Sequence, residues 1–422
     1  MRKMKDSGVE WIGEIPADWE VPRAKSVFQQ RLSKGNDQTI LLAATQKYGM
    51  YPQNLIEGVV QVKEDTDLQQ FKTVHRNDYV ISLRSFQGGF EISDYEGVCS
   101  PAYQVFFAKK EIDYKFYKYL FKSDGFISKM NALTVGIREG KTIQFKDFSD
   151  TMIPMPSVEQ QNRIATYLDS KTAAVDDAIS KQQALIDKLA AYKQSLITET
   201  VTKGLNPDAP MKDSGVEWIG AIPAHWTIKR LKYIVRISDG THDTPQYVVP
   251  SDNSFPLVTS KCISDGCIDV SLANHIGKKD YDEINKRSKV EQFDVIMPMI
   301  GTVGNPALVN EVPRFAIKNV ALLKTNASYI VGKYVQYLLI SDVFKKQIEY
   351  IVRGGVQNFI SQDKLKNMQF PVCDDMKMII DYLDTKCATI NANIAKRRTM
   401  IEKLTQYKKS LIYEAVTGKV EI

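Results

Sequence analysis

The stretch MKDSGVEWIGEIPADW at residues 4–19 recurs as MKDSGVEWIGAIPAHW at residues 211–226, with 14 of 16 positions identical. A second pair of similar stretches begins at Tyr167 and at Tyr382, reading YLDSKTAAVDDAISKQQALIDKLAAYKQSLITETVT and YLDTKCATINANIAKRRTMIEKLTQYKKSLIYEAVT. Two matches at nearly the same offset indicate internal repetition. The chain therefore contains one unit of roughly half its length twice.

The second pair of stretches predicts two long helices, because heptads run without Pro or Gly from 159 to 203 and from 374 to 417. Each helix would expose an apolar stripe, and the other helix is its nearest cover, so we expect an antiparallel pair related by a pseudo-two-fold axis. The seam residues are predicted at two sets of positions. The a positions are Leu168, Val175, Gln182, Leu189 and Leu196, then Leu383, Ile390, Arg397, Leu404 and Leu411; the d positions, three residues later, are Lys171, Ala178, Leu185 and Tyr192, then Lys386, Asn393, Met400 and Tyr407.

Two variable regions separate the repeated stretches. Each contains short β-rich runs between Gly, Asn and Asp turns, such as YVISL (79–83) and VIMPMI (295–300). The segment DYVISLRSFQGG (78–89) aligns with DVIMPMIGTVGN (294–305), which indicates that the two regions share a fold. The sequence thus predicts a mixed α/β protein with two globular α/β domains and two long antiparallel coiled-coil helices.

These boundaries define six segments. They are a first signature (1–19), a first variable domain (20–158), a first long helix (159–203), a linker with the second signature (204–226), a second variable domain (227–373) and a second long helix (374–422). The tryptophans and isoleucines of each signature predict docking by aromatic burial on equivalent ends of the two helices. Because the scaffold is repeated and the domains diverge, we expect the scaffold to bind two copies of one partner and each domain to read something different.

Composition narrows the class of protein. The formal net charge of +6 and the pI of about 8.7 fit a polyanion partner without demanding one. The first residues lack a signal peptide's apolar run, and no stretch is long enough for a membrane span, so a cytoplasmic location is expected. The five cysteines are scattered, as suits reduced thiols. No metal is expected, because Cys262 and Cys267 have no second ligand pair.

A search for catalytic groups finds none that is convincing. The segment GIREGKT (136–142) resembles a phosphate-binding loop, but it has three residues instead of four between its glycines. Asp169-Ser170-Lys171 and Asp384-Thr385-Lys386 resemble part of a nuclease carboxylate–lysine set, yet their place on the heptad helices favours a packing role. We therefore predict no catalytic residue and no enzyme activity in this chain.

What remains is chemistry suited to DNA. Arg and Lys neutralise phosphates and donate to guanine, while Gln and Asn match the adenine edge. For each residue the alternative is an ordinary solvated loop side chain. The candidate DNA-binding residues are Lys47, Tyr48, Arg84, Arg138 and Lys141 in the first variable domain, and Thr241, His242, Lys261, Arg314, Lys318, Arg353, Gln357 and Asn358 in the second.

The whole organisation resembles the specificity subunit of type I restriction–modification systems. The resemblance covers essentially the whole chain and rests on VEWIGEIP and VEWIGAIP, the helix ends KLxxYKxSLIxExVT, YGMYP in the first domain, and DGTHDTP and FPLVTS in the second. It implies that each variable domain is a target-recognition domain for one half of a bipartite double-stranded DNA sequence, and that the helices set the spacing between the halves.

The resemblance also implies partners. Two methyltransferase subunits would supply S-adenosylmethionine, and motor-nuclease subunits would supply ATP- and Mg-dependent translocation and cleavage, so no cofactor is expected in this chain. Two other classes remain open. One is a coiled-coil scaffold whose domains bind proteins, and the other is a self-contained methyltransferase or nuclease. Salt-dependent DNA binding would separate the first from the leading hypothesis.

Overall fold

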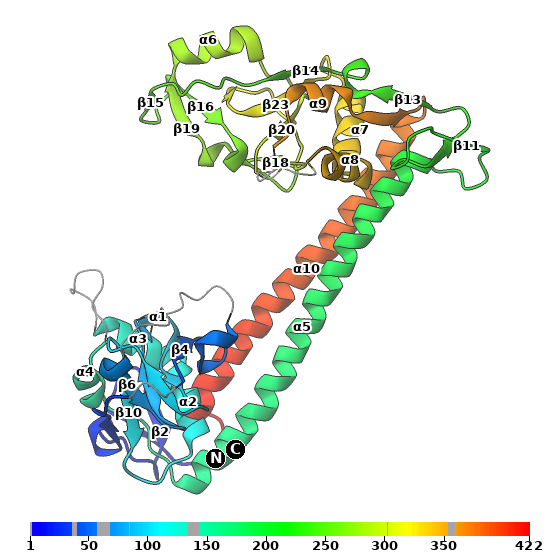
Figure 1. The fold of residues 1–422 in the computed structure, drawn as a ribbon. Helices are drawn as coiled ribbons and strands as arrows, with labels where there is room; N and C mark the ends of the chain where they lie inside the picture. Colours follow the sequence, from blue (N-terminus) through cyan, green and yellow to red (C-terminus); the bar gives the residue numbers. More distant parts are fainter. Residues whose placement is uncertain are drawn as a thin grey trace. The chain divides into compact units, whose positions relative to one another are not determined.

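The computed structural model describes residues 2–35, 40–56, 68–83, 85–133, 143–301, 303–352 and 359–422. It divides into two compact units: unit 1 comprises Met1–Gln183 and Arg398–Ile422, and unit 2 comprises Ala184–Arg397. Each unit holds one signature, one variable domain and part of both long helices. Helix α5 (Val158–Lys203) begins in unit 1, whereas helix α10 (Met376–Val416) begins in unit 2 (Figure 1).

Unit 1 is built on an antiparallel sheet of four strands in the order β3-β10-β7-β8. In the part of unit 1 that the structure describes, smaller strand pairs and four α-helices surround it. The sheet strands are β3 (Phe28–Gln30), β7 (Tyr79–Ile81), β8 (Glu91–Ile92) and β10 (Gln104–Ala108); the pairs are β1 (Met4–Asp6) with β2 (Glu14–Pro16), β4 (Leu42–Thr45) with β5 (Gly49–Pro52), and β6 (Lys72–Val74) with β9 (Gly97–Cys99). The helices are α1 (Ser85–Gly88), α2 (Tyr114–Lys122), α3 (Asp124–Ala132) and α4 (Phe145–Ser149).

Aromatic side chains fill the core of unit 1. Helix α2 starts where the Asp113 carboxylate accepts a hydrogen bond from the amide of Phe116 at 2.8 Å, which caps the free N–H groups of its first turn. Its buried face packs in the same core as the sheet, where the rings of Phe106 of β10 and Phe148 of α4 lie 4.8 Å apart. Burial of this apolar face holds a helix of only nine residues in place.

Unit 2 contains an antiparallel sheet in the corresponding order β14-β23-β20-β21. Its strands are β14 (Arg236–Asp239), β20 (Val295–Pro298), β21 (Ala307–Leu308) and β23 (Val320–Lys324). Strands β7 and β20 come from the aligned segments DYVISL and DVIMPM, and each is the third strand in its sheet. The two variable domains therefore share a core fold, as the sequence predicts.

Unit 2 carries further elements around this core. A second sheet has the order β15-β19-β16-β22, with β15 (Tyr247–Val248), β16 (Ser254–Val258), β19 (Asn274–Gly277) and β22 (Ala316–Ile317). The strand pairs are β11 (Met211–Asp213) with β12 (Ala221–Pro223), β13 (Thr227–Arg230) with β24 (Gln369–Val372), and β17 (Ile263–Ser264) with β18 (Cys267–Ile268). The helices are α6 (Lys278–Ser288), α7 (Tyr329–Ile340), α8 (Asp342–Val352) and α9 (Gln362–Asn367).

The long helices run antiparallel within each unit. In unit 1 the Lys408 ammonium lies 2.7 Å from the Asp176 carboxylate, while Leu168 shares a core cluster with Leu411. In unit 2 Lys193 donates to Asn391 at 2.9 Å. In the repeat alignment Asn391 corresponds to Asp176, and Lys408 corresponds to Lys193. The same contact therefore occurs once in each unit, as the predicted pseudo-two-fold repeat requires.

The seam residues differ in part from the prediction. Besides the predicted a positions, a second row of buried or half-buried residues lies four residues later instead of three, at Thr172, Ile179, Ile186 and Lys193 and at Cys387, Ile394, Ile401 and Lys408. Leu185 and Met400 were predicted in the seam, but they are 37% and 45% exposed. The prediction was wrong there because each is followed by another apolar residue, and heptad counting alone does not choose between the neighbours.

Each signature docks on the C-terminal end of a long helix. In unit 1 the Tyr413 hydroxyl of α10 donates to the carbonyl of Trp11 at 3.0 Å, and Trp19 is fully buried. In unit 2 Trp226 is buried in one cluster with Ile197 and Val201 of α5. The prediction that the signatures occupy equivalent helix ends is thus confirmed. None of the helices in the described ranges combines the length and apolar character that a membrane crossing requires.

Candidate nucleic-acid interface

Seven of the thirteen candidate DNA-binding residues lie within the described part of the chain. Arg84, Arg138, Lys141, Arg353, Gln357 and Asn358 lie outside the described residues. The others are Lys47 and Tyr48 in unit 1, and Thr241, His242, Lys261, Arg314 and Lys318 in unit 2. The structure brings Thr241, His242 and Lys318 together, whereas Lys261 and Arg314 lie on separate exposed segments.

Lys47 and Tyr48 form the tip of the β4–β5 hairpin. The Thr45 hydroxyl fixes this turn, since it accepts from the Tyr48 amide at 2.9 Å and donates to the Gly49 carbonyl at 3.0 Å. A Cβ at Gly49 would lie 2.4 Å from the carbonyl oxygen of Ile92, so only glycine fits. Tyr48 is 51% exposed, and the Lys47 ammonium lies 4.8 Å from its ring. A paired cation and aromatic ring suit a nucleic-acid surface.

Residues 239–246 of unit 2, DGTHDTPQ, form a loop bound to the edge between β22 and β23; we call it the 239–246 loop. The amide of Gly240 donates to Val320 at 3.0 Å, and the amide of Thr241 donates to Ile317 at 3.0 Å. A Cβ at Gly240 would lie 2.4 Å from the Ile317 carbonyl oxygen, so this close approach requires glycine. The backbone of the loop is therefore fixed by the sheet.

His242 clamps the loop through both ring nitrogens. Its Nε2 lies 2.8 Å from the Asp239 carboxylate, and its Nδ1 lies 2.9 Å from the Asn319 amide oxygen. The hydrogen bond with Asp239, followed by that with Asn319, raises the pKa of His242 above its ordinary value of 6.5, although burial and, to a smaller extent, Arg287 oppose the shift. Both nitrogens donate only in the imidazolium form, so this geometry favours a protonated histidine.

The clamp predicts a pH dependence of the 239–246 loop. Because folding raises the His242 pKa, the stability that the clamp contributes is complete below pH 6.5 and is lost as the pH rises through the folded-state pKa. NMR titration of the His242 ring, assigned with a His242→Gln variant, should give a higher midpoint in the folded chain than in the chain unfolded in urea. Equal midpoints would contradict the clamp.

The Lys318 side chain is not freely exposed. Lys318 is only 9% exposed, and its ammonium donates to the Thr244 hydroxyl of the 239–246 loop. The sequence identified Thr241, His242 and Lys318 but missed their partners Asp239 and Asn319. The motif DGTHDTP contains Asp239, so it offered a signal for that residue. Asn319 comes close only because β22 and β23 return to the loop.

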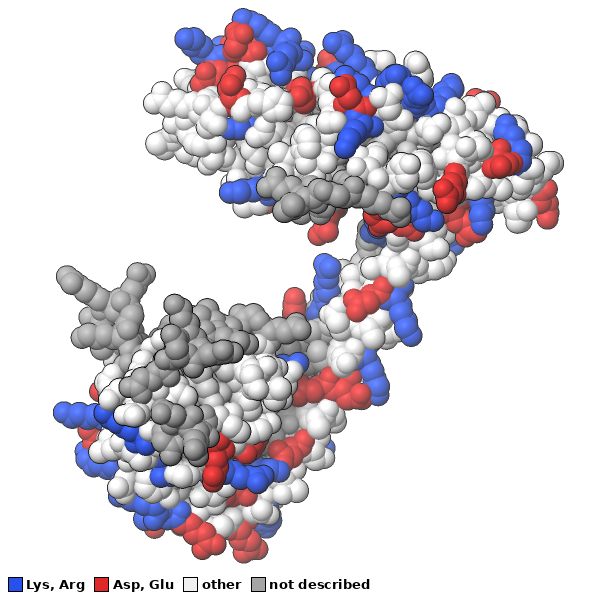
Figure 2. Space-filling model, viewed as in Figure 1, with Lys and Arg blue, Asp and Glu red and all other residues white. Residues whose placement is uncertain are grey.

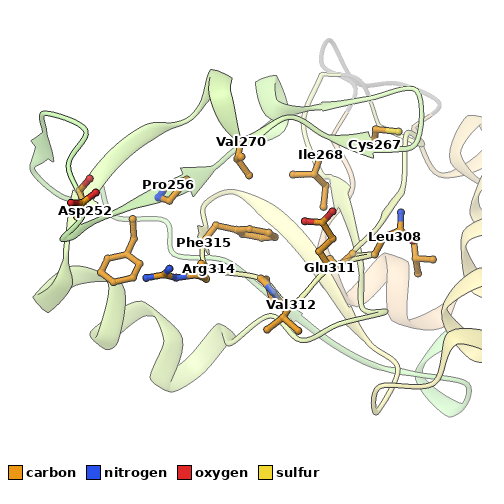
Figure 3. Close-up of a pocket in the computed structure, with 15 residues that line it drawn as sticks. Asp252, Pro256, Cys267, Ile268, Val270, Leu308, Glu311, Val312, Arg314 and Phe315 are labelled. Atoms are coloured by element: carbon orange, nitrogen blue, oxygen red, sulfur yellow. The ribbon is translucent and has the colours of Figure 1, made fainter.

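Arg314 lines the cavity of about 680 Å³ in unit 2 that Figure 3 shows. Apolar side chains such as Val270 and Phe315 line it together with the carboxylates of Asp252 and Glu311. Two carboxylates disfavour a phosphate in this cavity. Figure 2 shows Lys and Arg over α6, which contributes Lys278, Lys279, Lys286 and Arg287, interspersed with Asp and Glu of the same helix. Within the ranges that the structure covers, no three His, Cys, Asp or Glu side chains are grouped to hold a metal ion.

The sequence of this chain is also similar to that of known proteins. Residues 16–187 match the family model described as type I restriction modification DNA specificity domain. The MjaVIII specificity subunit of a type I restriction enzyme from Methanocaldococcus jannaschii is 23% identical, over 97% of this chain and 94% of its own length. The EcoBI specificity subunit of Escherichia coli is 25% identical, over 70% of this chain and 64% of its own length.

Solved structures agree in fold. A chain from a structure of a type I R-M system superposes with a TM-score of 0.68 at 17% identity, covering 96% of this chain and 99% of that one. The HsdS subunit of Thermoanaerobacter tengcongensis superposes with a TM-score of 0.50 at 15% identity, covering 96% and 98%. The repeated signatures, the shared sheet order and the paired helices agree with these similarities: the chain resembles specificity subunits of type I restriction–modification systems in sequence and shares its fold with the solved structures.

Proposed function

We propose that this chain reads a bipartite double-stranded DNA sequence, with one half-site read by the variable domain of each unit. The observation behind this proposal is that the signatures are nearly identical and the long helices are similar in the two repeats, whereas the domains share a sheet order and differ in their side chains. A shared fold with divergent surfaces is what two readers of different half-sites need. The matched DNA specificity domain supports this assignment.

In this proposal the long helices set the gap of unspecified base pairs between the half-sites. The chain itself performs no chemistry. Two methyltransferase subunits dock on the repeated scaffold and bring S-adenosylmethionine, while restriction subunits bring ATP and Mg²⁺. The two-fold repetition of the Lys–Asp and Lys–Asn contacts supports a scaffold that offers two equivalent docking positions.

Selection from a randomised duplex library with the full chain, alone and with its methyltransferase partner, tests the proposal. We expect enrichment of two short conserved half-sites separated by a fixed number of variable positions. Binding should weaken steeply with salt, since each neutralised phosphate lowers log K by about 0.9 per unit of log salt. Enrichment of no sequence in either form would overturn DNA reading and favour a protein-binding scaffold.

A further inference from the structure

Asp169 of α5 joins the variable domain of unit 1 to the long helix. Its carboxylate accepts from the Lys115 ammonium at 2.6 Å and from the Tyr119 hydroxyl at 2.8 Å, both of helix α2. Burial alone would raise the pKa of Asp169, but these two hydrogen bonds outweigh burial and hold the pKa below its usual value. Burial raises the pKa of Tyr119 to about 12. The carboxylate is therefore ionised, and the phenol is a neutral donor, throughout the physiological range.

Unit 2 repeats this contact at the corresponding residue. Asp384 of α10 pairs with the Lys333 ammonium at 3.0 Å and accepts from the hydroxyls of Tyr337 and, at 3.0 Å, Tyr329. All three donors lie on helix α7. In the alignment of SDGF (123–126) with SDVF (341–344), Lys115 corresponds to Lys333 and Tyr119 to Tyr337. Domains that otherwise diverge thus keep the same donor pair for the same aspartate.

A second contact joins each domain to the other long helix. In unit 1 the Lys409 ammonium of α10 lies 3.3 Å from the Asp124 carboxylate at the start of α3. In unit 2 Gln194 of α5, the counterpart of Lys409, donates at 3.0 Å to Asp342 at the start of α8. In unit 1, α2 is therefore attached to α5 and α3 to α10, whereas in unit 2 α7 is attached to α10 and α8 to α5. Two separate attachments prevent rotation about either one.

We infer that Asp169 and Asp384 are positioning residues that fix the orientation of each DNA-reading domain on the long helices and so set how strictly the spacing between half-sites is enforced. This inference rests on the proposed function. Hydrogen bonds from Lys and Tyr to one carboxylate are directional. Apolar packing tolerates rotation and sliding better than directional bonds do. Loss of the carboxylate should therefore loosen the domain without altering the loops that read bases.

The test uses the full chain and two sets of duplexes. Selection from a randomised library with the wild-type chain first yields the half-sites and their spacing. Binding is then measured on duplexes that keep both half-sites and lengthen or shorten the gap by one or two base pairs. We expect Asp384→Ala to reduce the preference for the natural gap at least tenfold and to leave the half-site sequences unchanged. Asp169→Ala should act in the same direction but less strongly, because Asp384 has one more donor.

Matched variants separate positioning from general damage. Asp177→Ala removes an exposed aspartate of α5 that pairs with Lys181 of the same helix at 2.6 Å, and its gap preference should equal that of wild type. Tyr337→Phe keeps the ring and removes one donor, so it tests the contact if Asp384→Ala fails to fold by circular dichroism. A gap preference within twofold of wild type in every folded variant at Asp384 or Tyr337 would overturn the inference. Absence of any sequence preference in wild type would instead overturn the proposed function.

Discussion

Removing residues 177–183 from α5 together with residues 401–407 from α10 is expected to shift the preferred gap between half-sites by up to about three base pairs, with both half-sites unchanged. Seven residues shorten a helix by ~10 Å at 1.5 Å per residue, and base pairs are stacked about 3.4 Å apart. One heptad also returns the remaining seam residues to nearly the same face. The two shortened helices should therefore still pair with each other.

These two segments face each other in unit 1, next to the retained contact between Asp176 and Lys408. Library selection with the double deletion, followed by comparison of the enriched gaps, measures the effect. Deletion of 177–183 alone serves as the control, because it leaves α10 with an unmatched heptad and should abolish ordered binding. An unchanged gap in the folded double deletion would refute the idea that helix length sets the spacing.

Asp78→Ala is expected to destabilise unit 1 by about 3–5 kcal/mol. The Asp78 side chain is 3% exposed and accepts from the Arg31 guanidinium at 2.6 and 2.9 Å and from the His75 amide at 2.8 Å. Removing the carboxylate leaves a largely buried guanidinium without its counter-charge and a turn amide without its acceptor. Hydrogen exchange with mass spectrometry reports the loss for unit 1 separately from unit 2.

The corresponding Asp294→Ala change in unit 2 leaves Lys324 its second partner, Glu291, at 2.7 Å. It also removes the acceptor of the Glu291 and Thr325 amides, which donate to the fully buried Asp294 carboxylate at 2.8 and 3.0 Å, so we expect a comparable loss. Asp150 provides an exposed control: it pairs with Lys25 at 2.7 Å on the surface, so Asp150→Ala should leave exchange protection unchanged. Equal exchange protection in wild type and Asp78→Ala would contradict the view that the Arg31–Asp78 pair stabilises the turn at residues 75–78 before β7.

Much of the fold could be predicted from the repeated stretches of sequence. Heptads of this length, with Gly204 and Asn206-Pro207 after the first, leave little alternative to long helices, and 158–203 is the helix found. The match of DYVISL with DVIMPM identified corresponding strands, because a buried strand keeps its apolar pattern while exposed loops diverge. The seam register was less determined, since Leu185-Ile186 and Met400-Ile401 each offer two adjacent apolar residues.

The amino-acid sequence alone is enough to predict the two-fold repeat, the paired helices, the shared fold of the variable domains and the resemblance to specificity subunits. The tertiary structure alone decided which unit each helix end belongs to, that Lys318 lies under a loop, and that Asp169 and Asp384 join the domains to the helices. The difference comes from the distance along the chain over which each kind of interaction acts. Periodicity and turn residues act between near neighbours in the chain, whereas Asp239 meets Asn319 through His242, and Asp169 meets Tyr119, only after strands and helices distant in sequence have packed together.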